Sequence, residues 1–255
     1  MTRILAIARN TVREAVRERL MLVLGLFGFA LLLGSQALSP LALGEGRKVV
    51  IDFGLAGSML LATLLSVFLG SSLLHKELER KTLDSILAKP VRREEFVLGK
   101  FFGLWFTTAV LLAAEALILA SVVTVAYGRT PWTIAGATAL SVIELGIVTA
   151  VVVLFSSFTT PALTAFFGIA AVVVGHFAED LHYFATHGAP LLVRAMTEAV
   201  YWALPHLSVF NARGLAVHDI AVEPERMLFA IGYGGLYIAA LMIFAGTIFR
   251  RRELK

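Results

Sequence analysis

Six long apolar stretches, separated by polar segments, run through this sequence of 255 residues. One helix needs roughly 20 apolar residues to cross a bilayer core about 30 Å thick. The stretches are 20–38, 53–74, 101–125, 134–155, 162–177 and 227–249, of which the fifth is the shortest. The pattern predicts an all-α membrane protein with six transmembrane helices in a single domain, residues 1–255.

Composition supports this class. Hydrophobic residues make up 58% of the chain and charged residues 16%, against about 25% charged residues in ordinary soluble domains. A soluble enzyme is therefore excluded. The chain has no cysteine, which also excludes disulfides and Cys-based zinc sites.

The segment 1–19 combines regularly spaced arginines with apolar residues between them. Arginine occupies positions 3, 9, 13, 17 and 19, and isoleucine, valine and alanine fill much of the remainder. Such a mixture is typical of a basic amphipathic helix that lies in the headgroup layer. The alternative is an ordinary charged flank of the first span.

The basic residues also predict an orientation. Sixteen of the 22 Lys and Arg fall in 1–19, 75–100 and the C-terminus, and six fall in the segments on the other side. Because cytoplasmic loops carry the excess of Lys and Arg, both termini and the loop 75–100 are expected in the cytoplasm. The basic residues form no stripe interleaved with aromatics, so no nucleic-acid partner is predicted.

Residues 178–226 are too long and too apolar for a simple connection. They are predicted to fold on the extracytoplasmic side into short outer helices before the last span. One helix is expected over 190–204 and is ended by Pro205. Pro224 occupies a position typical of a helix N-terminus.

The loop 75–100 has the most distinctive polar pattern. Leu83, Ile86 and Leu87 form a narrow apolar stripe on a short predicted helix that Pro90 ends. This stripe could pack on its own bundle or could bind a separate cytoplasmic protein.

The loop resembles the first cytoplasmic loop of ABC-2 type ABC transporter permeases, and in particular the six-helix permeases similar to that of the nitrous-oxide-reductase maturation transporter. The matching residues are Glu77, Glu79, Thr82, Leu83, Leu87, Pro90, Arg93, Glu95, Gly99 and Lys100. In one departure, Lys81 replaces the Gly that many relatives have before the Thr. Pro205, Phe210 and Asn211 resemble a second stretch of that family, before the last span.

The resemblance implies that the loop helix is a coupling helix that contacts an ATPase subunit, with Glu77, Glu79, Thr82, Leu83, Ile86 and Leu87 as the coupling residues. It further implies two permease copies and two P-loop ATPase subunits in the cell inner membrane. The chain itself has no P-loop and no hydrolase motif, so we expect no enzyme activity and no cofactor.

Two carboxylates, Glu115 and Glu144, fall near the middle of consecutive predicted spans. Ionisable residues inside the membrane are expensive, so they normally face a cavity or a partner. We expect both residues on the translocation path, at similar depth, where they could share a proton. The alternative is that each is protonated and bonds a neighbouring hydroxyl for packing.

Two smaller patterns complete the analysis. Gly99 and Gly103 form a GxxxG motif, for which packing within the subunit is favoured over a dimer seam. Histidines 176, 182, 187, 206 and 218 lie in or beside the outer segment, with Glu179 and Asp180. Their spacing matches no recognised metal-ligand pair, so we expect interfacial anchoring and no metal site.

The sequence leaves three functions open. The first is the permease subunit of an ATP-driven transporter. The second is a proton-coupled secondary transporter that uses Glu115 and Glu144, and the third is a membrane scaffold without transport.

Overall fold

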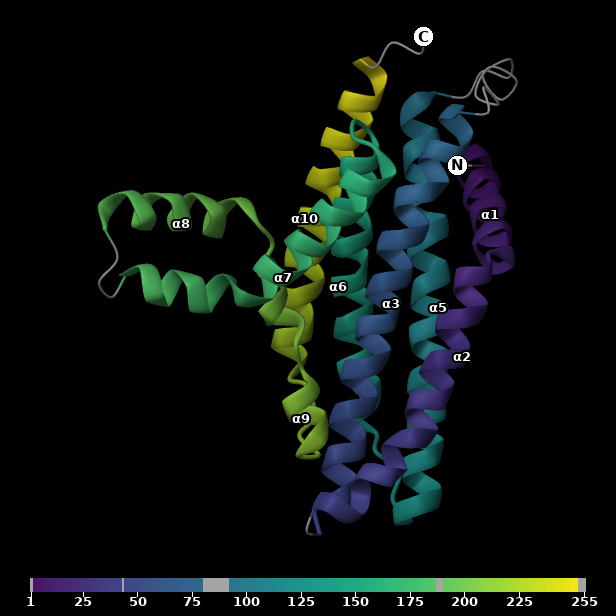
Figure 1. Ribbon diagram of the computed structural model, residues 1–255, viewed down its shortest axis with the longest axis vertical. Coiled ribbons are helices and arrows are strands. Elements are labelled where there is room, and N and C mark those ends of the chain that lie inside the picture. The colour runs from purple at the N-terminus through teal and green to yellow at the C-terminus, as the bar shows by residue number, and fades with distance from the viewer. Residues whose placement is uncertain (1, 43, 80–91, 187–189, 252–255) are drawn as a thin grey trace.

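The computed structural model describes residues 2–42, 44–79, 92–186 and 190–251, and their regular structure is helical throughout (Figure 1). The longer helices are α1 (Thr2–Arg17), α2 (Arg19–Gly34), α3 (Gly46–Glu79), α5 (Arg93–Tyr127), α6 (Thr133–Ser156), α7 (Pro161–Thr186), α8 (Leu191–Ala203) and α10 (Pro224–Arg251). Shorter elements are the 3₁₀ helices η1 (Ser35–Ala42) and η2 (Leu207–Phe210), and the single-turn helix α9 (Arg213–Val217).

Six of these helices are long and apolar enough to span a membrane, which confirms the predicted number. The apolar spans are Arg19–Ala37, Gly46–Ser72, Arg93–Tyr127, Thr133–Ser156, Pro161–Tyr183 and Pro224–Arg250. Each contains most of one predicted stretch. The largest difference at a single helix end is in α7, where the prediction ended at 177 and the helix continues to Thr186.

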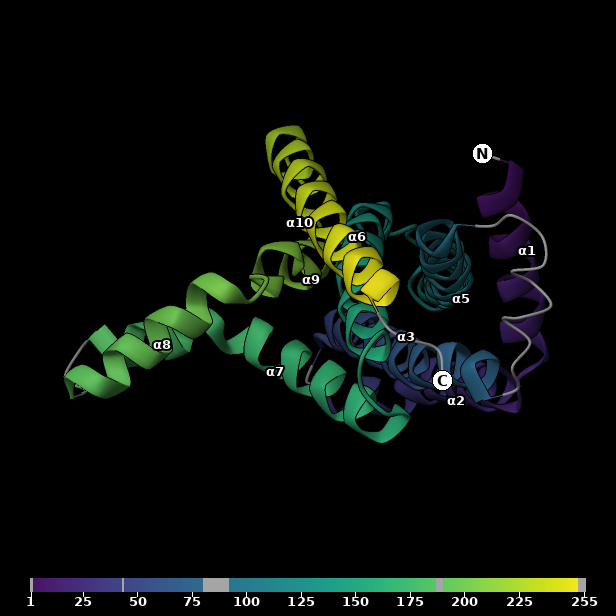
Figure 2. The same cartoon turned by 90° about the horizontal axis from the view of Figure 1, so that it is seen from above.

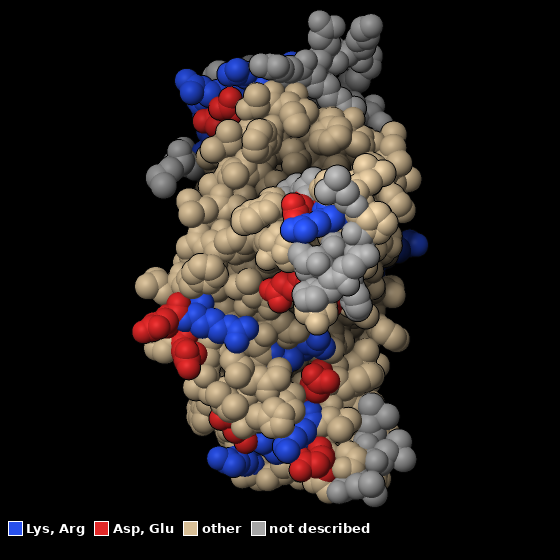
Figure 3. Space-filling model, turned by 90° about the vertical axis from the view of Figure 1, so that its left-hand side faces the viewer, with Lys and Arg blue, Asp and Glu red and all other residues tan. Residues whose placement is uncertain are grey.

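The two ends of the bundle differ in composition. At one end α3 finishes, α5 begins and α10 finishes, and we call this the basic end. The opposite end, which we call the loop end, holds η1, the connection 128–132 and α9. Figure 3 shows Lys and Arg gathered at the top, which is the basic end, and mixed charges over the lower half, with a mostly uncharged band between them.

Helices α3 and α6 form the centre of the bundle. In the apolar, membrane-spanning part of each of these two helices, 61% of the residues are buried, against 17% in α2 and α10. Their contact includes a hydrogen bond of 2.9 Å between the hydroxyls of Ser66 and Thr149. Helix α5 is joined to α6 by the Trp105 indole, whose Nε1 donates to the Val142 carbonyl at 2.9 Å. The remaining spans therefore pack around this pair, with much of their apolar surface facing outward.

Helix α1 is separate from the first span because the backbone of Glu18 is extended between two helices. In the view along the bundle, α1 runs across the outside of α5, which is seen nearly end on (Figure 2). Thr11 and Ala15 are fully buried on this side, whereas Leu5 and the arginines face outward. An amphipathic helix is thus present within the predicted segment, over Thr2–Arg17, and its placement in the headgroup layer stays a prediction.

The segment before the last span has two parts, an arm formed by the end of α7 with α8, and a return to the bundle formed by η2 and α9. The end of α7 and all of α8 project sideways from the bundle (Figures 1 and 2). Helix α8 occupies the region where a helix over 190–204 was predicted, and α10 begins at Pro224 as expected. Between them, η2 and α9 return to the bundle, where Leu207 and Phe210 are buried.

Candidate functional site

The start of α5 is packed closely against α1. An added Cβ at Gly99 would lie 2.6 Å from Ile7, and one at Gly103 would lie 2.6 Å from the Ala8 carbonyl oxygen and from Thr11. Only glycine allows the two backbones this approach. The GxxxG motif therefore serves packing within the subunit, as the sequence favoured.

Charged groups add to this connection at the basic end. The Lys100 ammonium, 2% exposed, lies 3.2 Å from the Glu14 carboxylate of α1. The Arg93 guanidinium donates to the carbonyls of Phe249 and Arg250 at the end of α10, at 3.5 and 3.2 Å. A cation placed there satisfies carbonyls that a helix C-terminus leaves open. The first turns of α5 thus join α1 to α10.

The predicted coupling residues adjoin this junction. Glu77 and Glu79 fall on the last turn of α3. Thr82, Leu83, Ile86 and Leu87 lie outside the described residues, as does the predicted loop helix. The described chain resumes at Arg92, whose N–H donates to the Glu95 carboxylate at 3.0 Å as α5 begins. The segment 80–91 therefore joins α3 directly to the turns of α5 that hold α1 and α10.

Glu144, on α6, is almost fully buried and faces α7. Its Oε1 lies 3.1 Å from Nε2 of His176, and its side chain is 3% exposed. The two atoms lie within ion-pair distance, and the histidine is charged only when it is protonated. The other ring nitrogen of His176, Nδ1, lies 3.0 Å from the Val172 carbonyl of its own helix.

Glu115, on α5, occupies a different environment. Its carboxylate lies directly against Gly28 of α2, where an added Cβ would overlap Oε1. Ser58 of α3 faces the same group. Both carboxylate oxygens and the Ser58 hydroxyl are buried without a hydrogen bond to any residue that the structure describes. The expected proton sharing with Glu144 is therefore wrong, since the partner of Glu144 is His176.

The outer histidines are dispersed. The ring of His182 stacks on Tyr201 at 4.4 Å, and His206 packs edge-on against the same tyrosine at 4.2 Å. His218 ends α9, and His187 lies outside the described residues. Among residues 2–42, 44–79, 92–186 and 190–251, no three His, Asp or Glu side chains come close enough to hold a metal ion.

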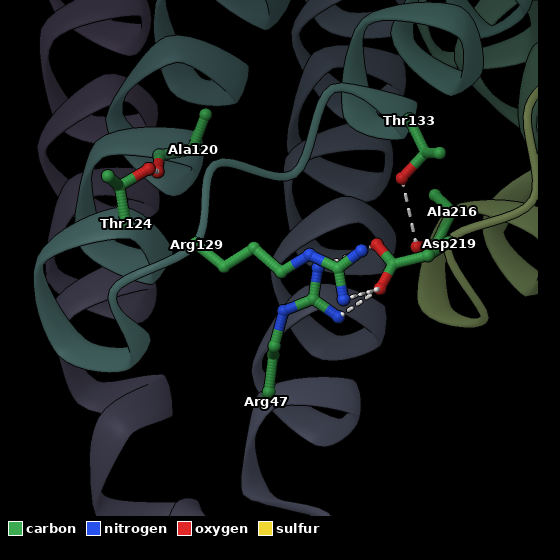
Figure 4. Close-up of polar contacts among 7 residues, drawn as sticks. All are labelled: Arg47, Ala120, Thr124, Arg129, Thr133, Ala216 and Asp219. Atoms are coloured by element: carbon green, nitrogen blue, oxygen red, sulfur yellow. Dashed lines mark hydrogen bonds and ion pairs between the residues drawn. The ribbon is translucent and has the colours of Figure 1, made fainter.

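An ion-pair cluster at the loop end was missed by sequence reasoning. Both oxygens of Asp219 accept from the Arg47 guanidinium, at 2.6 and 2.7 Å, and Arg129 approaches at 3.8 Å (Figure 4). Thr133 also donates to the Ala216 carbonyl at 3.1 Å. Three segments distant in sequence are thereby joined. The φ of Asp219 is +58°, a left-handed conformation that Asp tolerates better than most residues.

The Asp219 cluster makes stability depend on pH. The hydrogen bond from Arg47 is the main cause that holds the pKa of the Asp219 carboxyl below its ordinary value. Burial opposes it, and the charges of Arg47 and Arg129 add to the lowering. A depressed pKa contributes stability above the unfolded-state pKa of about 3.9, and this contribution is lost as pH falls through the folded value.

We therefore expect Asp219→Asn to lower Tm by about 2–4 °C at pH 7, corresponding to about 1 kcal/mol for a partly exposed pair. The difference from the parent protein should begin to shrink below about pH 5 and should disappear only as pH falls through the lowered folded-state pKa of Asp219. Lys48→Gln is the control, because it removes an exposed ion pair with Glu45 at the same end of the bundle. A Tm difference that persists unchanged to pH 3 would contradict the assigned role of the charge.

Six apolar spans, one basic end and two carboxylates buried between neighbouring helices together define a multi-pass helical membrane protein. The ABC-2 family transporter protein family matches residues 5–254, nearly the whole chain. The chain therefore belongs to the ABC-2 transporter family and is a permease component of an ABC transporter, a transmembrane component that is not itself catalytic. No curated protein matches it.

Proposed function

We propose that the chain couples to a separate P-loop ATPase and works as a pair of permease copies with two ATPase subunits. The basic end would face the cytoplasm of the cell inner membrane, in line with the distribution of Lys and Arg. ATP would be bound and hydrolysed in the partner, and residues 75–100 would receive the resulting movement. The order of charged residues in this loop favours the nitrous-oxide-reductase maturation subgroup.

The observation that carries the proposal is the set of contacts at the start of α5, where this helix meets both α1 and α10. This helix follows the coupling loop directly, contacts α1 through Gly99 and Gly103, and holds the end of α10 through Arg93. Further along, Trp105 joins it to α6. A displacement of the loop would therefore move four helices together, because packed helices shift as rigid elements.

The decisive test is the double substitution Leu83→Asp and Leu87→Asp. Two carboxylates on the apolar stripe should abolish co-purification with a co-expressed P-loop ATPase subunit that the parent permease retains, because burying unpaired charge at an interface is costly. Tm of the isolated permease should stay unchanged. Ser85→Asp, which adds a charge on the opposite side of the predicted helix, should retain the partner. Normal co-purification of the double variant would refute the docking assignment.

A second candidate, proton-coupled secondary transport, is favoured by one contact, that of Glu144 with His176 inside the bundle. It predicts uptake or efflux in proteoliposomes that contain the permease alone and a pH gradient. Transport that requires both the ATPase and ATP would exclude it.

A further inference from the structure

A cavity of about 170 Å³, open on one side, lies within a single subunit, between α3, α6, α7 and the residues around α9. An engineered cavity of about 150 Å³ binds benzene, so this volume suits a ligand of one ring or a short chain. One part of the wall is apolar, with Met59, Leu60 and Val172. The polar part consists of Thr63, Ser141, Glu144, His176, Asn211 and Arg213.

The contact between Glu144 and His176 implies one shared proton. A carbonyl can only accept, so Nδ1 of His176 carries a hydrogen toward Val172. In a neutral ring Nε2 is then a lone pair, and it lies 3.1 Å from a carboxylate oxygen. Two lone pairs at that distance repel each other, which favours one proton in the pair. With this one proton bound, the pair has no net charge, whether it is written as imidazolium with carboxylate or as imidazole with carboxylic acid.

With the pair neutral, the Arg213 guanidinium gives the cavity wall a net charge of +1. Its Nε donates to the neutral Asn211 side chain at 3.3 Å, and within the described chain no Asp or Glu lies in ion-pair distance of it. Glu144 and Arg213 are the charged groups that act on His176, and α3 contributes no titratable side chain to the wall. A partly buried charge without an oppositely charged partner is costly, and an anion in the cavity would offset that cost.

We propose that this cavity binds a small organic anion, whose charged group lies against Arg213 and the Glu144–His176 pair and whose apolar part lies against Met59, Leu60 and Val172. The site lies within one subunit and needs no ATPase, so it stands or falls separately from the proposed coupling. Loss of the proton would make the pair negative and the cavity neutral. Anion affinity should therefore fall as pH rises.

The test is calorimetric titration of the full chain, purified in a neutral detergent without the ATPase. Three probes of equal size are compared: benzoate, benzyl alcohol and benzylamine. Benzoate is expected to bind at least tenfold more tightly than the alcohol at pH 6, and benzylamine not to bind. Equal affinity for benzoate and benzyl alcohol, or no benzoate binding, would overturn the proposal.

Variants make the assignment specific. Arg213→Gln should lower the affinity for benzoate at least tenfold while Tm is retained. Glu115→Gln, which changes the buried carboxylate outside the cavity, should leave the benzoate affinity unchanged. Glu144→Gln should preserve benzoate binding, because it removes a negative charge from the wall and leaves Arg213 in place. Benzoate affinity that Arg213→Gln does not alter, or that Glu144→Gln abolishes, would contradict the site.

The same anionic chemistry could come from a soluble carboxylate or from a lipid headgroup phosphate. Titration in nanodiscs separates these sources. Phosphatidylglycerol that competes with benzoate, where phosphatidylcholine does not, would identify the lipid headgroup as ligand. Equal benzoate affinity in both lipids would identify a soluble anion.

Discussion

Replacing Gly103 by leucine is expected to displace α1 from α5 and to uncouple the basic end. The new side chain would start 2.6 Å from the Ala8 carbonyl oxygen and from Thr11, in a contact formed partly by backbone. Overpacking of this kind costs about 1–3 kcal/mol, and backbone cannot move aside as a flexible side chain can. Tm should therefore fall by several degrees, roughly 2–4 °C per kcal/mol.

The displacement itself can be measured by spin labels, since the chain has no native cysteine. Cysteines at Arg9 on α1 and at Leu117 on α5, both exposed, would report a narrow distance distribution in the parent and a broad one in Gly103→Leu. Gly235→Leu is the matched control, because an added Cβ there meets no atom within 4 Å. If both leucine variants keep the parent distance, the α1–α5 contact does not depend on glycine.

Phe210→Ala is expected to give the largest loss of stability. The Phe210 ring is fully buried in the main core cluster and lies 6.1 Å from the Tyr233 ring of α10. A buried Phe→Ala replacement costs about 3–5 kcal/mol through lost contacts and the cavity left behind. That corresponds to a fall in Tm of roughly 10 °C.

Phe229→Ala provides the comparison, since Phe229 lies on α10 with 62% of its surface exposed. It should change Tm by less than about 1 °C, as substitutions at exposed positions usually do. Hydrogen exchange should also accelerate in residues 207–217 of Phe210→Ala, because η2 is held to the bundle by that ring. Equal shifts in the two variants would contradict the role assigned to Phe210.

The order and number of spans could be predicted from sequence for a physical reason. A helix satisfies its backbone hydrogen bonds internally, so a run of about 20 apolar residues has one stable form in a bilayer. Proline at 190, 205 and 224 likewise marked the bounds of α8 and the start of α10, because the ring removes a donor and fixes φ. The end of α7 was placed too early, since the helix continues through polar residues such as Glu179 and Asp180, which are exposed.

Which groups meet was decided by the tertiary structure. Glu115 and Glu144 were expected together, yet the rotation of each helix about its own axis directs one toward Gly28 and the other toward His176. Asp219 and Arg47 are 172 residues apart and form a two-bond ion pair. Hydropathy records whether a position suits lipid or water. It does not record the rotation and crossing of packed helices, and these alone bring Glu144, His176 and Arg213 to the wall of one cavity.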